Sequence, residues 1–147
     1  MTLRLFVYGT LKRGGRFHDA FCRGFVSVER ATVRGRLRWL PAGYPMIDVA
    51  VATVLAEGTA DPTADVGTQQ RLDDRAAGTA VDATWPAVPG ELMTFDDAAV
   101  RLPRIDELEH FRPEAPRSTN LYRRVLVPVS RQSGGVVAAW VYVNASR

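Results

Sequence analysis

Residues 5–15 read Leu5-Phe6-Val7-Tyr8-Gly9-Thr10-Leu11-Lys12-Arg13-Gly14-Gly15, an apolar run that breaks into a glycine-punctuated, cationic turn. Leu3, Leu5 and Val7 alternate with Arg4 and Phe6, which predicts a strand with one buried face. Gly9 permits backbone angles that a side chain would resist, so consecutive amides of the turn can face a ligand. Alone, the pattern indicates only an opening strand and its turn, and a functional reading needs a second feature.

The composition indicates one soluble domain spanning residues 1–147. A chain of 147 residues can bury a core, and 46% hydrophobic with 24% charged residues is ordinary for a globular protein. Its apolar runs are too short to cross a bilayer and it opens with no signal peptide, so we expect a cytoplasmic protein without a membrane partner. The lone Cys22 excludes an internal disulfide framework, and two histidines disfavour a zinc site. The arginines are scattered and no nucleic-acid-binding signature is visible, so no nucleic-acid partner is expected.

The rest of the chain reads as strands with a few short helices. Residues 56–85 lose apolar periodicity, and we expect a surface insertion or flexible loop there, with one helical turn near Thr68 to Asp74. Without long βα alternation, the pattern favours a small, mainly antiparallel sheet or barrel with helices at its mouth, an α+β fold, over a parallel sheet. The predicted elements are a short helix over Phe17 to Phe25, a half-buried strand over 26–40 with a bulge near Glu29, strands over Met46 to Leu55 and Pro89 to Phe95, a helix capped by Asp96-Asp97 through Leu102, a helix over Arg104 to His110, and strands over Tyr122 to Val129 and Val136 to Val143.

The second informative feature is the acidic segment Ile105-Asp106-Glu107-Leu108-Glu109. Asp106 and Glu109 are three residues apart, so they share a helix face, whereas Glu107 points elsewhere. An acidic helix is usually a solvated face. A carboxylate at a helix C-terminus beside apolar side chains, however, has a raised pKa, which suits Glu109 to proton transfer near neutrality. Asp106 is either a structural or surface carboxylate or a second base.

Taken in order, these segments resemble the γ-glutamylcyclotransferase-like family, particularly its γ-glutamylamine cyclotransferase branch and bacterial relatives. The resemblance covers nearly the whole chain except residues 56–85. One departure is His110-Phe111, because the family usually has glycine after the catalytic glutamate. The matching segments are Tyr8 to Gly14 with His18, Val33-Arg34-Gly35-Arg36-Leu37, Gly43-Tyr44-Pro45, Pro89-Gly90-Glu91-Leu92, Ile105 to Glu109, Tyr122-Arg123-Arg124-Val125 and Ala139-Trp140-Val141-Tyr142-Val143.

The resemblance implies the family's small β-barrel flanked by helices, with a cavity at one end. It implies cyclisation of a γ-glutamyl group to 5-oxoproline with release of the free amine, without a metal or other cofactor. Glu109 would be the catalytic acid/base, the backbone of Tyr8, Gly9, Thr10 and Leu11 would bind the γ-glutamyl moiety, and Tyr122 would line the pocket. The expected partner is a small γ-glutamyl substrate, and the expected assembly is a monomer or a small homo-oligomer.

Two alternatives to this enzyme remain open on the sequence alone. One is a non-catalytic small-molecule binding module on the same fold, which the substitution after Glu109 favours. The other is a tailoring enzyme that removes a γ-glutamyl group from a larger metabolite. Tyr122 either lines the pocket or only packs in the core.

Overall fold

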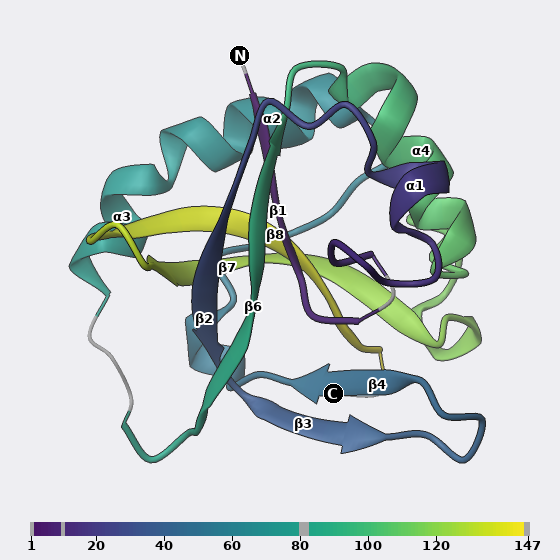
Figure 1. The fold of residues 1–147 in the computed structure, drawn as a ribbon, viewed down its shortest axis with the longest axis horizontal. Helices are drawn as coiled ribbons and strands as arrows, with labels where there is room; N and C mark the ends of the chain where they lie inside the picture. The colour runs from purple at the N-terminus through teal and green to yellow at the C-terminus, as the bar shows by residue number, and fades with distance from the viewer. Residues whose placement is uncertain (1, 10, 80–82, 146–147) are drawn as a thin grey trace.

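Five strands of the computed structural model close into a barrel (Figure 1). The structure describes residues 2–9, 11–79 and 83–145. Around the barrel the order is β2-β6-β1-β8-β7, and β2 pairs with β7 to close it. β1 and β8 run parallel, and the other barrel pairs are antiparallel, which confirms the predicted fold class. The barrel strands are β1 (Leu3–Val7), β2 (Ser27–Arg34), β6 (Ala87–Phe95), β7 (Tyr122–Arg131) and β8 (Val136–Asn144).

The core has two parts, and the first strand contributes to both. Leu3, Leu5 and Val7 join a cluster that includes residues of the surrounding helices, whereas Phe6 joins the second cluster, built largely of strand residues. Because Phe6 is buried as well, the expectation of one buried face for this strand is wrong. A barrel strand covered by helices is shielded from solvent on both sides.

The predicted long strand over 26–40 is interrupted at Gly35. A Cβ there would lie 2.7 Å from the main-chain oxygen of Asp48, so the close backbone approach requires glycine. β2 ends before it, and β3 (Arg36–Trp39) leaves the barrel to pair with β4 (Pro45–Asp48). β2 pairs with β6 without a skipped residue, so the bulge expected near Glu29 is absent from that pairing. The predicted strand over Met46 to Leu55 is confirmed as far as Asp48 by β4 and is wrong beyond it, since β4 is followed by the 3-10 helix η1 (Val51–Thr53).

Residues 56–85 contain regular structure where a loop was expected. β5 (Ala56–Glu57) pairs with β7, and α2 (Pro62–Arg71) and α3 (Asp73–Gly78) follow it. Asp61 caps α2 by accepting a hydrogen bond from the amide of Ala64. The helical turn expected near Thr68 to Asp74 falls on these two helices. Their full extent was missed because the buried face of α2 carries the polar residues Asp65 and Gln69, which remove the apolar periodicity.

The remaining helices lie near the first loop and the acidic segment. In Figure 1, α1 and α4 lie together at one side of the barrel, away from α3. The two helices predicted over 96–110 form the single helix α4, which continues through the exposed Pro103. Asp97 is the N-cap residue, but its carboxylate binds Arg101 and not a main-chain amide. The bounds are α1 (His18–Phe21), α4 (Ala98–Leu108) and the 3-10 helix η2 (Arg117–Thr119). Among the described residues, no helix combines the length and apolar character needed to span a membrane.

Candidate active site

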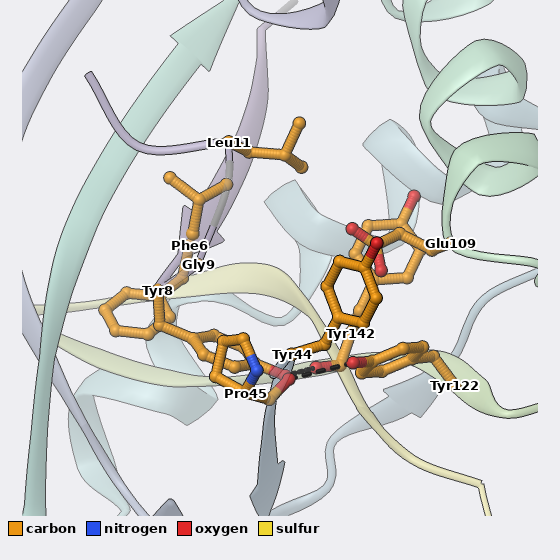
Figure 2. Close-up of a pocket in the computed structure, with 10 residues that line it drawn as sticks. Phe6, Tyr8, Gly9, Leu11, Tyr44, Pro45, Glu109, Tyr122 and Tyr142 are labelled. Atoms are coloured by element: carbon orange, nitrogen blue, oxygen red, sulfur yellow. Dashed lines mark hydrogen bonds between the residues drawn. The ribbon is translucent and has the colours of Figure 1, made fainter. Parts of the chain in front are cut away.

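A cavity of about 50 Å³ brings together segments from both halves of the chain (Figure 2). The predicted residues Tyr8, Gly9, Leu11, Glu109 and Tyr122 all line it, whereas Thr10 lies outside the described residues. A volume of this size accommodates a small chemical group and excludes a macromolecule. The other lining residues are Phe6, Val7, Tyr44, Pro45 and Tyr142.

Glu109 reaches the cavity from the C-terminal end of α4. Its side chain extends from the helix toward the tyrosine rings, across the cavity from Gly9 and Leu11 (Figure 2). Two hydrogen bonds end the helix: the amide of His110 donates to the carbonyl of Glu107 (3.1 Å), and that of Phe111 donates to the carbonyl of Asp106 (2.9 Å). This pair of bonds, with His110 at φ 52°, is the Schellman arrangement of a helix terminus. The terminus therefore fixes the direction in which Glu109 points.

Burial and, to a smaller extent, the negative charge of the neighbouring Asp106 together raise the pKa of Glu109 to about 7. Burial and the carboxylate of Asp106 both disfavour the charged form of Glu109. At neutral pH Glu109 is present in both protonation states, so it can accept and return a proton. The raised pKa agrees with the sequence-based expectation.

Two tyrosines of the cavity use their hydroxyl groups to hold its walls together. The Tyr8 hydroxyl donates to the main-chain oxygen of Tyr142 (2.7 Å) and accepts from the amide of Ile47 (3.3 Å). The Tyr122 hydroxyl donates to the main-chain oxygen of Pro45 (2.8 Å). Burial raises the pKa of Tyr122 to about 12 and that of Tyr8 well above its usual value. Both phenols therefore stay neutral at physiological pH.

The loop after β1 approaches the cavity through its backbone. A Cβ on Gly9 would lie 3.0 Å from Cγ of Pro45, so a larger residue would push the two cavity walls apart. The carbonyl of Leu11 lies 3.0 Å from Nδ1 of His18, which braces the loop as a structural contact. Arg13 binds Glu91 through its side chain and its amide, and neither residue lines the cavity.

Asp106 is buried and held by two partners. Its carboxylate accepts two hydrogen bonds from the Arg124 guanidinium (2.8 and 3.0 Å) and one from the Tyr142 hydroxyl. This arrangement fits the structural alternative for Asp106 better than the second-base alternative. Glu107, in contrast, is exposed as predicted.

A sequence model of the γ-glutamyl cyclotransferase, AIG2-like family matches residues 5–74 and 55–147. Together the two matches span nearly the whole chain. The chain belongs to this family. In a comparison with curated proteins, no sequence matches significantly.

Solved structures of similar fold include proteins from mouse and from a bacterium. An AIG2-like protein from Mus musculus superimposes with a TM-score of 0.58 at 18% identity, over 99% of this chain and 79% of that one. YkqA from Bacillus subtilis superimposes with a TM-score of 0.57 at 18% identity, over 98% of this chain and 36% of that one. At this identity the likeness concerns the fold, which is the family's barrel with short helices.

His110 is the residue at which the family resemblance led us to expect glycine. Its φ of 52° is the left-handed conformation that glycine adopts most readily. The helix terminus thus keeps its form although the residue has changed. The presence of His110 is therefore compatible with a Glu109 side chain that lines the cavity.

The main lining residue missed by sequence reasoning is Tyr142. It is two residues beyond the buried Trp140, and this spacing places both side chains on the same face of β8. That periodicity places Tyr142 with Trp140 in the core cluster that includes residues of the surrounding helices. The periodicity does not reveal that Tyr142 and Glu109 line the same cavity, because this depends on how α4 packs against the barrel.

The Cys22 thiol is not activated as a nucleophile. Burial raises the pKa of the Cys22 thiol to about 12, which leaves it protonated and weakly nucleophilic. Within residues 2–9, 11–79 and 83–145, no group of three or more His, Cys, Asp or Glu residues is arranged to hold a metal ion.

Proposed function

We propose that the protein cyclises the γ-glutamyl group of a γ-glutamyl amine or related amide to 5-oxoproline and releases the free amine. The observation that carries this proposal is the position of Glu109, a carboxyl group with a pKa of about 7 that faces a small cavity. Family membership supports the same reaction class.

In this reaction the substrate supplies its own nucleophile. The α-amine nitrogen forms a bond to the γ-carbonyl carbon, and the bond from that carbon to the leaving nitrogen breaks. The reaction consumes no water, because the γ-glutamyl amide is converted into the lactam 5-oxoproline and the free amine. Holding the glutamyl chain folded supplies proximity, which in well-oriented intramolecular reactions lowers the barrier by roughly 7–11 kcal/mol.

Glu109 would carry the proton between the two nitrogens. As a carboxylate it accepts a proton from the α-ammonium group, and as a carboxylic acid it returns a proton to the leaving amine. A group with a pKa near the working pH performs both transfers, and such catalysis contributes roughly 10²–10⁴-fold.

The loop after β1 would bind the γ-glutamyl group. Gly9 and Leu11 face Glu109 across the cavity, so main-chain amides of this loop are suited to the substrate carboxylate or to the developing oxyanion (Figure 2). Tyr122 would form part of the opposite wall, where its hydroxyl already binds Pro45. Because the cavity is small, the leaving amine would lie at its mouth.

A substrate panel tests the reaction class. The protein is incubated with γ-glutamyl amines, γ-glutamyl dipeptides and glutathione, and 5-oxoproline and the free amine are quantified. We expect equal amounts of both from at least one member. The matched N-acetyl compound should give neither product, because its blocked nitrogen cannot attack. If panel members bind but no product forms, the result would reject the enzymatic function and support a small-molecule binding module.

A further inference from the structure

The buried ion cluster behind Glu109 has no role in the reaction as described above. Arg124 is at its centre and is 1% exposed. Its guanidinium donates to Asp106, to Asp65 of α2 (2.8 Å) and to the main-chain oxygen of Thr59 (3.0 Å). One guanidinium thus faces two buried carboxylates, which leaves one excess negative charge inside the protein.

The cluster is connected directly to the cavity. Asp106 is three residues before Glu109, so both carboxyl groups lie on the same face of α4. Asp106 also accepts a hydrogen bond from the hydroxyl of Tyr142, whose ring lines the cavity. In addition, the Asp106 carbonyl accepts from the amide of Phe111 and so ends the helix at Glu109.

The other titratable groups that face Glu109 carry no charge at neutral pH. They are Tyr8 after β1, Cys22 after α1, Tyr122 of β7 and Tyr142 of β8, and burial raises the pKa of each. Tyr44, before β4, contributes a further phenol to the lining. Asp106 is therefore the charged group among the described residues that acts most directly on Glu109.

We propose that Asp106 is a positioning residue for Glu109. By binding Arg124 and Tyr142 it joins the last turn of α4 to β7 and β8, and it places a negative charge beside the cavity. Glu109 is thereby held facing the substrate and remains able both to accept and to release a proton. This inference rests on the proposed function of Glu109.

The Asp106→Asn variant separates this role from a purely structural one. Without the Asp106 charge, Arg124 and Asp65 form a balanced pair, and the asparagine carbonyl can still accept from Arg124, so we expect the protein to fold. The titration of the Glu109 carboxyl is followed by ¹³C NMR, with the resonance assigned by its loss in Glu109→Gln. We expect its midpoint to fall by roughly half to one pH unit in Asp106→Asn.

Two further variants serve as controls. Glu107→Gln removes an exposed charge one residue away on the same helix and should leave the midpoint unchanged. Tyr142→Phe keeps the Asp106 charge, so its midpoint should not fall, and it provides a test if Asp106→Asn does not fold. An unchanged midpoint in folded Asp106→Asn, or a lowered midpoint in Tyr142→Phe, would overturn the proposal.

Turnover distinguishes this inference from the proposed function. Where the panel yields a substrate, the acid limb of kcat/KM against pH should move with the NMR midpoint. A lowered midpoint without turnover of any substrate supports the action of Asp106 on Glu109 and rejects the cyclotransferase activity. Turnover with an unchanged midpoint in Asp106→Asn supports the activity and rejects the role of Asp106.

Discussion

At the scale of single residues, the carboxyl group of Glu109 makes the protein less stable when it ionises. Its pKa in the folded protein is about 7, above the ordinary value of 4.5. Below pH 4.5 the carboxyl is protonated in both states and has no effect on folding. As the pH rises from 4.5 to 7, the unfolded chain releases this proton first, so the free energy of unfolding decreases. Well above pH 7 the carboxyl is ionised in both states, and the free energy of unfolding decreases no further on its account.

The Glu109→Gln variant should therefore be more stable than the wild type only at high pH. Glutamine is close in shape to a protonated glutamate but cannot ionise. We expect its free energy of unfolding to exceed that of the wild type by up to about 3 kcal/mol at pH 8 and to match it at pH 4. Urea denaturation at the two pH values measures the difference. The same stability difference at both pH values would contradict the buried position of this carboxyl.

His110 offers a second prediction at this scale. Its φ of 52° is unfavourable for a residue with a side chain and is natural for glycine at a helix terminus. We expect His110→Gly to raise the free energy of unfolding by about 1 kcal/mol. We expect His110→Val to lower it, since a β-branched residue tolerates this conformation poorly. Denaturation of both variants at one pH gives the comparison, and a destabilised His110→Gly would show that the strain is absent.

At the scale of elements, the sequence predicts those parts whose signals are local and apolar. The strands over Tyr122 to Val129 and Val136 to Val143 are confirmed by β7 and β8, because each contains a run of apolar, β-prone residues. The helix α2 could not be predicted in this way, since its buried positions include Asp65 and Gln69. Gln69 binds Thr2 and Arg4, and Asp65 binds Arg124 as well as the nearby Thr59, and no local pattern reveals the distant partners.

Gln69 tests whether α2 is an integral part of the fold. Its side chain is fully buried, accepts from the amide of Arg4 (2.8 Å) and donates to the carbonyl of Thr2 (2.9 Å). We expect Gln69→Leu to lower the free energy of unfolding by about 2 kcal/mol or more, because two main-chain groups lose their partner. Gln70→Leu, at the exposed neighbouring position, should change it by no more than about 0.5 kcal/mol. Equal effects in the two variants would mean that α2 does not pack as described.

At the scale of the whole molecule, the fold brings residues that are distant in the sequence together around one cavity. Tyr8 follows β1, Glu109 is the C-cap residue of α4, and Tyr122 begins β7, and all three line one cavity. The first two could be predicted because a glycine-rich turn and a helix-end carboxylate are visible locally. The contribution of Tyr142, and the bonds that place Asp106 behind the cavity, depend on the packing of α4 against β7 and β8 and could not be predicted.

The most direct test is the rate of 5-oxoproline formation by Glu109→Gln and by the wild type, measured on a γ-glutamyl amine that the wild type cyclises. Glutamine fills the same space but cannot transfer the proton. We predict a fall of roughly 10²–10⁴-fold, with folding intact by circular dichroism. Glu107→Gln, which alters the exposed neighbouring carboxylate, should retain the wild-type rate. A folded Glu109→Gln protein that forms 5-oxoproline at the wild-type rate would contradict the role of Glu109 as the acid/base.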